Sequence, residues 1–225
     1  PRRAVNEGLV DRFGLIDPGP RGSTARYSVS GEAHRGSGKS LSSISGYAIR
    51  YDFDLVSNFT YFLDDPVNGD QFEQADERWI FGLGLDHRWS GHVGSVHANN
   101  AVGVDLRYDT ISNGLYRTTD LVRTFTTRED DIRQLGGGLW GETWLQLNPK
   151  VRLNLGLRAD YYGADVDAFR EVNSGTADDW MLNPKASLIW STSRSTELSF
   201  NAGSGFHSND ARGATIRIDP VTGEP

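Results

Sequence analysis

The alternation of apolar and polar residues between Ser45 and Leu55 most constrains how this chain can fold. Side chains leave a β-strand on opposite faces with a period of two, so the pattern predicts a strand. The segment exceeds the usual strand of about five or six residues and matches the roughly 9–11 residues that a tilted strand needs to cross a bilayer. One face would carry Ser45, Tyr47, Ile49, Tyr51, Phe53 and Leu55, and the other Gly46, Ala48, Arg50, Asp52 and Asp54.

The same alternation recurs along the chain, with an apolar face opposite a face rich in arginine and aspartate. If the apolar face meets lipid, the charged face must meet water inside a closed barrel. Alternation alone favours a membrane barrel over a soluble sheet, which also has a polar outer face. The recurring segments are residues 79–88, 102–109, 151–161 and 197–203.

Composition supports this interpretation and excludes several classes. The sequence has no uncharged apolar stretch of 18 residues and a mean hydropathy of −0.49, so it predicts no transmembrane helix. A net charge of −7 argues against a nucleic-acid partner. The absence of cysteine excludes disulfides and thiolate metal sites.

Eight strands are expected, joined by connections that alternate in length. Short turns at one end and long loops at the other are typical of the periplasmic and extracellular ends of an outer-membrane barrel. Aromatic residues near both ends agree with two interfacial girdles, although cross-strand pairing in a soluble sheet would also place them there. The expected strands are 24–35, 41–56, 76–90, 99–110, 131–147, 151–165, 182–191 and 196–206; the short turns are 36–40, 91–98, 148–150 and 192–195; the long segments are 63–75, 111–130, 167–179 and the residues after His207.

Two blocks of sequence carry a resemblance to a known family. Ser57–Pro66, running on to Gly69–Gln74, resembles the barrel of TonB-dependent outer-membrane receptors. So does Asn183–Leu188, followed by Asn201–Gly203 and Gly205–Gly213. The resemblance covers about Arg26 to Gly213. It implies an N-terminal plug inside an antiparallel, up-and-down barrel of about 22 strands, which imports a scarce nutrient with energy from an inner-membrane complex.

We therefore expect residues 1–225 to be a partial barrel domain in the bacterial outer membrane, without plug, signal peptide or closing C-terminal strand. The resemblance implies lipid as one partner, the TonB complex as another through the plug, and a ferric siderophore or similar large solute as ligand. Two alternatives remain open at this point. One is a soluble all-β ligand-binding or carbohydrate-binding module, and the other is a complete eight-stranded barrel.

None of the sequence motifs for catalysis or metal binding that we considered is complete. Gly36–Ser40 lacks the first glycine of a phosphate-binding loop, because that position is Ala33. The acidic pairs at 64–65, 130–131 and 178–179 have no EF-hand spacing. The five histidines form no local zinc spacing, and no Gly-x-Ser-x-Gly elbow occurs. We expect no enzyme, no cofactor and no metal site.

The alternation also assigns side chains to the two surfaces of the barrel. Where the last expected strand ends, four polar residues could contact ligand, although turn chemistry alone explains most of their types. The expected lipid-facing residues are Tyr47, Ile49, Phe53, Leu153, Leu155 and Leu198; the expected lumen-facing residues are Arg50, Asp52, Arg152, Arg158 and Glu197; the candidate ligand contacts are His207, Asn209, Asp210 and Arg212.

Overall fold

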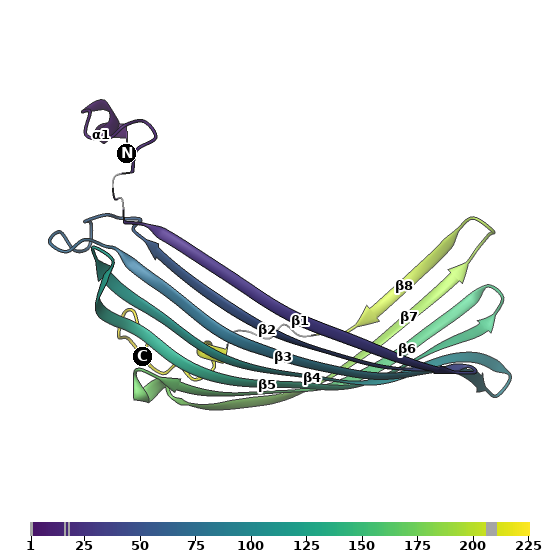
Figure 1. Ribbon diagram of the computed structural model, residues 1–225. Coiled ribbons are helices and arrows are strands. Elements are labelled where there is room, and N and C mark those ends of the chain that lie inside the picture. The colour runs from purple at the N-terminus through teal and green to yellow at the C-terminus, as the bar shows by residue number, and fades with distance from the viewer. Residues whose placement is uncertain (1, 16, 18, 206–210) are drawn as a thin grey trace.

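Eight strands form one antiparallel sheet in the order of the sequence (Figure 1). The computed structural model describes residues 2–15, 17, 19–205 and 211–225. The all-β expectation is confirmed. The elements are α1 Arg2–Asn6, β1 Arg21–Ser37, β2 Ser40–Ser57, β3 Phe72–Val93, β4 Val96–Thr119, β5 Val122–Asn148, β6 Val151–Ala168, η1 Glu171–Asn173, β7 Gly175–Ser191, β8 Glu197–Gly203 and η2 Ala211–Gly213.

Each of the eight expected segments is a strand, but the long loop expected at 111–130 is wrong. β4 continues to Thr119 and β5 begins at Val122, so that only Asp120 and Leu121 connect them. Both have positive φ, 49° and 67°, as a two-residue hairpin turn requires. A strand pair that projects into water can be polar on both faces, and it therefore resembles a loop in sequence.

The connections at the two ends of the sheet differ in character. At one end, called the short-turn end below, residues 38–39, 94–95, 149–150 and 192–196 connect successive strands. At the other end, called the loop end, residues 58–71 follow β2 and residues 169–174 follow β6. The loop end also bears the projecting β4–β5 hairpin, so part of the expected asymmetry lies in strand length.

Cross-strand register divides the side chains into an apolar face and a polar face, because directly paired residues share a face. The apolar face holds Ile44, Ala48, Trp79, Phe81, Leu83, Leu85, Val102, Val104, Leu106, Leu139, Leu155, Leu157, Leu182, Leu188, Leu198 and Phe200; the polar face holds Tyr47, Arg78, Asp105, Arg107, Asp109, Trp140, Arg158, Asp160, Lys185 and Asn201.

The register reverses the expected orientation of β2. Tyr47 pairs with Gly82 on the polar face, whereas Arg50 pairs with Trp79 on the apolar face. The expectation that Tyr47, Ile49 and Phe53 share a face with Leu153, Leu155 and Leu198 is therefore wrong. So is the grouping of Arg50 and Asp52 with Arg152, Arg158 and Glu197, although these last three do share the polar face.

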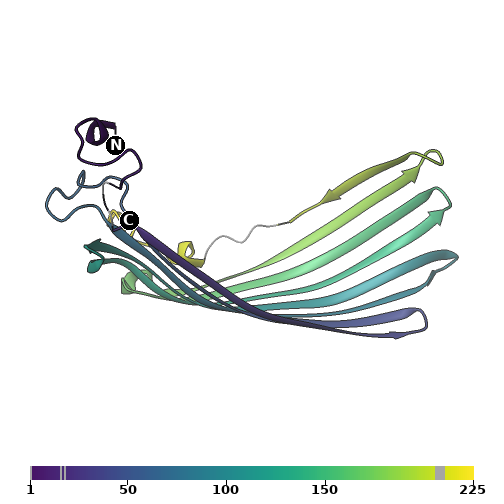
Figure 2. The ribbon, with the colours of Figure 1, turned by 45° about the horizontal axis from the view of Figure 1, so that its top comes forward.

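The sheet is open and curved, and residues 211–225 lie on its concave side (Figure 2). Ala211 is 2% exposed and packs against Ile111, Ile132 and Val166 of the polar face, so the polar face is the concave one. In the described part of the chain, no helix is long and apolar enough to cross a membrane. β1 and β8 are not paired, so the alternative of a complete eight-stranded barrel is wrong.

Candidate functional site

The apolar face is an exposed hydrophobic surface of defined height. Leu139 and Phe200 are 62% and 61% exposed, which a soluble sheet of this size would not tolerate. Trp79 and Trp89 lie ten residues apart in β3, and Trp180 and Trp190 lie ten residues apart in β7. Ten residues of a strand tilted by about 40° rise roughly 25 Å, the height of the apolar band of a membrane barrel.

These two tryptophan pairs enclose uncharged positions. Tryptophan prefers the membrane interface, where its ring is half in hydrocarbon and half in water. The pairs therefore indicate an outer and an inner boundary of one lipid-facing band. The apolar-face positions between them are Phe81, Leu83, Leu85 and His87 in β3, and Leu182, Pro184, Ala186 and Leu188 in β7.

Arg50 and Asp52 lie on the loop-end side of this band. The Arg50 Nη2 atom donates to Glu77 Oε2 at 2.7 Å and also contacts Asp52. Its guanidinium lies 5.7 Å from the centre of the Trp79 ring. This cluster begins where the apolar band ends, which explains how two charged side chains can occupy the apolar face.

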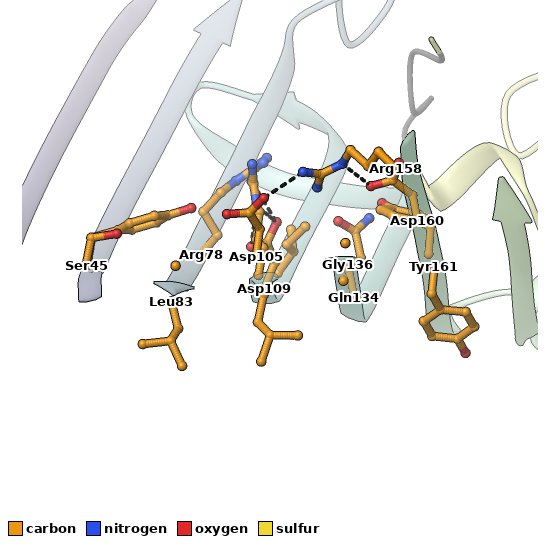
Figure 3. A pocket seen from close by; sticks show the side chains of 18 residues that line it. Ser45, Arg78, Leu83, Asp105, Asp109, Gln134, Gly136, Arg158, Asp160 and Tyr161 are labelled. Atoms are coloured by element: carbon orange, nitrogen blue, oxygen red, sulfur yellow. Dashed lines mark hydrogen bonds and ion pairs between the residues drawn. The ribbon is translucent and has the colours of Figure 1, made fainter. Parts of the chain in front are cut away.

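The polar face carries a network of arginines paired with aspartates (Figure 3). Arg158 bridges two strands, since its Nη1 donates to Asp105 Oδ2 and its Nε to Asp160 Oδ1, both at 2.6 Å. Arg107 binds Asp109 with two nitrogens, at 2.9 and 2.8 Å. In Figure 3 Leu83 and Tyr161 point away from this network. The charges therefore neutralise one another along the wall.

Many of these pairs come from a short local pattern, an arginine and an acid two residues apart. Residues i and i+2 of a strand share a face, so this spacing places both charges side by side. Arg128 and Asp130 pair in this way at the loop end, and Arg88 and Asp86 pair nearer the short-turn end at 2.8 Å. The sequence pattern alone would have found these pairs.

On the polar face, Gly82, Gly103 and Gly138 leave room for large side chains of the neighbouring strands to lie flat against the sheet. These three residues are called the shelf of glycines below. A Cβ atom on Gly82 would come within 2.2 Å of the Tyr47 ring, and one on Gly103 within 2.4 Å of the Trp140 ring. One on Gly138 would meet the Arg158 guanidinium at 2.0 Å. Because these side chains lie along the wall, an open hollow of about 600 Å³ remains above β2 to β6.

At the short-turn end, Arg152 and Glu197 also pair across the polar face. Arg152 Nη2 donates to Glu197 Oε1 at 2.9 Å, and the Ser191 hydroxyl donates to the same oxygen at 2.6 Å. These contacts connect β6, β7 and β8 near the 192–196 turn. The charges of Arg152 and Glu197 are therefore paired within the sheet and need no ligand as a partner.

The loop after β2 is organised around Asp70. Its carboxylate accepts backbone N–H groups from Leu63, Asp64 and Asp65 at 2.7 to 3.2 Å. Desolvation tends to raise the pKa of Asp70, but these hydrogen bonds and one from the Thr60 hydroxyl lower that pKa to about 2. The acidic pair at 64–65 therefore takes part in loop structure.

The candidate ligand contacts lie at the edge of the described part of the chain. His207, Asn209 and Asp210 lie outside the described residues, and Arg212 is described only as part of the η2 backbone. Sequence reasoning missed Asn173, which holds the segment after η2. Its Oδ1 accepts the N–H groups of Arg217 and Ile218 at 2.9 and 3.0 Å, and its Nδ2 donates to the Ile218 carbonyl at 2.8 Å.

The family of this chain follows from comparison with known proteins. A model of the TonB-dependent receptor-like β-barrel family matches residues 6–222. The chain belongs to this family. TonB-dependent receptors are outer-membrane transporters and not enzymes, so the expectations of an outer-membrane location and of no enzymatic activity are confirmed. The alternative of a soluble all-β module is wrong.

Solved structures of TonB-dependent receptors share the fold at low sequence identity. The unliganded ferric citrate transporter FecA matches with a TM-score of 0.70 and 11% identity over 90% of this chain and 30% of that one. The ferric-catecholate import receptor Fiu of E. coli K12, in its open form, matches with 0.66 and 10% over 86% and 38%. The copper transporter OprC matches with 0.62 and 16% over 82% and 32%.

The chain thus spans about a third of the length of these proteins. No curated protein matches the sequence. The resemblance read from the sequence is confirmed at the level of the family and of the barrel fold.

Proposed function

We propose that this chain forms part of the barrel wall of a receptor that imports a scarce nutrient, a ferric siderophore or similar large solute, with energy from the TonB complex. The observation that carries the proposal is the pairing of an exposed apolar band with a concave face of neutralised charges. In a membrane barrel the first meets lipid and the second meets water. The polar face would then line the lumen.

The character of the wall supports a large polar solute. Arg158 and Arg107 are already paired with aspartates. These two arginines therefore attract a small anion only weakly. The shelf of glycines keeps bulky side chains flat and leaves a wide, water-accessible surface. Such a wall can let a hydrated solute or a folded plug slide past without trapping it.

The structural relatives favour a metal-containing solute. The matched structures include a ferric citrate transporter, a ferric-catecholate import receptor and a copper transporter. Iron complexes of this kind are too large for simple diffusion through narrow pores, and uphill import needs an energy source. We therefore place the TonB complex among the proposed partners, reached through a plug domain.

Ligand recognition is proposed for the loop end, where functional groups concentrate on a rigid scaffold. His207, Asn209, Asp210 and Arg212 follow β8 and offer donors, acceptors and both charges. The neighbouring Ala211 is buried against the polar face. Turn formation remains the competing explanation for these residue types.

Uptake by cells that produce the full-length receptor tests the proposal. Cells would receive a panel of radiolabelled ferric siderophores, ferric citrate and copper complexes, with TonB present or absent. We expect at least one complex to accumulate only when both the receptor and TonB are present. If no complex accumulates above the receptor-negative strain, or if uptake is independent of TonB, the proposed function is wrong.

The rim block is tested in the same assay. The variants His207→Ala and Arg212→Ala should lower uptake while surface abundance stays normal, if these side chains contact the solute. Uptake at the parental level in both variants would assign the block to loop structure alone.

A further inference from the structure

Two histidines meet at the short-turn end of the sheet, in the hairpin that connects β3 and β4. Gly94 and Ser95 form the turn, and Gly94 has the positive φ of 62° that such a turn requires. His92 and His97 are directly paired across the hairpin, one step from Val93 and Val96. Directly opposite residues have Cβ atoms about 4.5–5.5 Å apart and lie on one face.

The distance between the two rings fits a shared metal ion. Their centroids are 5.4 Å apart, and the ring planes are inclined at 70°. A metal ion binds an imidazole nitrogen at about 2.0–2.1 Å, which places it roughly 3.2 Å from the ring centroid. Two imidazoles on one ion at about 90–110° would then have centroids roughly 4.5–5.2 Å apart. The observed separation is slightly larger than this range, so the two rings would have to rotate out of their edge-to-face contact to bind one ion.

Both imidazoles are exposed and have nitrogens available for a ligand. Within the described part of the chain, neither ring takes part in a hydrogen bond or ion pair, and their contact is with each other. The other described histidines are engaged differently. The His87 Nδ1 atom lies 2.8 Å from the Ser42 hydroxyl, and His34 contacts Glu32 at 3.3 Å.

A side chain that could serve as a third metal ligand lies next to the two histidines. Gln146 of β5 is the register partner of His97 on the polar face. Its Nε2 group donates to the Asn148 carbonyl at 2.7 Å, so its oxygen remains available as an acceptor. Among the described residues, no group of three or more histidine, cysteine or acidic side chains could hold a metal ion. The site therefore consists of two imidazoles with an open coordination sphere that water or an amide oxygen can complete.

We propose that His92 and His97 form a two-histidine site for a first-row transition-metal ion, with Cu²⁺ bound more tightly than Ni²⁺ or Zn²⁺. Imidazole suits these ions, whereas Ca²⁺ and Mg²⁺ prefer oxygen ligands, and the stability order among them favours copper. The site lies on the polar face where the barrel opens at its short-turn end, which is the periplasmic end in the proposed orientation. It does not depend on which solute the receptor imports.

Copper binding to the purified full-length receptor in detergent tests the site. After removal of residual metal with a chelator, Cu²⁺ would be titrated by calorimetry and the complex examined by electron paramagnetic resonance. We expect His92→Ala and His97→Ala each to weaken one binding event by about tenfold or more and to change the nitrogen hyperfine pattern, because one imidazole ligand is lost. His87→Ala and His34→Ala are matched controls and should leave that event unchanged.

A second measurement does not depend on the variants. Diethyl pyrocarbonate modifies free imidazoles, and peptide mass spectrometry would locate the modification in the unsubstituted receptor. Cu²⁺ should protect the peptide containing His92 and His97, while Ca²⁺ at the same concentration should not. Unchanged copper binding in both alanine variants, or equal modification with and without Cu²⁺, would overturn the proposal.

Discussion

Leu83→Arg should severely destabilise the barrel, whereas Ser45→Arg at the same depth should be tolerated. Leu83 lies on the apolar face and Ser45 on the polar face, and the two belong to neighbouring rows, since Leu83 pairs with Gly46 and Ser45 with Gly84. Both substitutions add the same cation to the same pair of strands. Any difference between them therefore reports which face meets lipid.

The depth of Leu83 in the apolar band sets the expected free-energy cost of Leu83→Arg. Leu83 lies four residues from Trp79 and six from Trp89, so it is roughly 10 Å below the outer tryptophan in a band about 25 Å high. This depth is close to the midplane, where a lipid-facing arginine costs about 2–4 kcal/mol. A cost of this size lowers the folding equilibrium constant roughly 30- to 900-fold, since 1.36 kcal/mol is a factor of ten.

Folding of the full-length receptor into lipid vesicles provides the assay. Folded and unfolded forms would be separated by their electrophoretic mobility without heating, across a denaturant titration. We expect a loss of about 2–4 kcal/mol for Leu83→Arg and less than about 1 kcal/mol for Ser45→Arg. Equal losses for the two variants, or a larger loss for Ser45→Arg, would refute the assignment of the faces.

Three further predictions follow from contacts in the structure. Arg158→Ala leaves its aspartate partners without their cation and should lower the free energy of unfolding by about 0.5–1.5 kcal/mol in the same assay, because water partly screens these exposed charges. Gly103→Ala brings a Cβ atom within 2.4 Å of the Trp140 ring, so it should cost about 1–3 kcal/mol and shift tryptophan fluorescence, whereas Gly91→Ala, with no atom within 4 Å, should do neither. Asp70→Asn should accelerate hydrogen exchange in the loop after β2 at pH 5. Because the pKa of Asp70 is lowered to about 2, its contribution is complete above about pH 4 and is lost as the pH falls through 2, so at pH 5 the unsubstituted loop should stay protected.

Clear negative results would contradict each of these. Unchanged stability of Arg158→Ala would mean that the wall charges contribute nothing beyond solvation. Equal effects of the two glycine variants would show that Trp140 does not lie on Gly103. A loop that exchanges equally fast in the parent and in Asp70→Asn at pH 5 would exclude the carboxylate as its organiser.

Much of the fold was predictable because the relevant signal is local. A period of two identifies a strand without reference to any other strand, and five of the eight strand segments showed it clearly. The arginine and acid pairs within one strand are equally local, as Arg107 and Asp109 show. The expectation of a barrel segment of a TonB-dependent outer-membrane receptor rested on such patterns together with two motif blocks, and the family match confirms it.

The failures concern decisions that one strand cannot make alone. The pattern shows that Tyr47 and Arg50 lie on opposite faces of β2, but only pairing with β3 decides which face joins the apolar band. The Tyr47 ring lies on the polar face, where Gly82 of β3 leaves room for it, and the small residues Gly46 and Ala48 lie on the apolar face.

What the sequence determined by itself was the set of strands, their alternating faces and the class of protein, since these depend on chemistry repeated at short range. The tertiary structure alone decided the orientation of β2 and the length of the β4–β5 hairpin. It also decided the packing of Ala211 against the polar face and the pairing of His92 with His97. Each of these depends on cross-strand register, and register is set by many weak contacts between strands, which no single stretch of sequence contains.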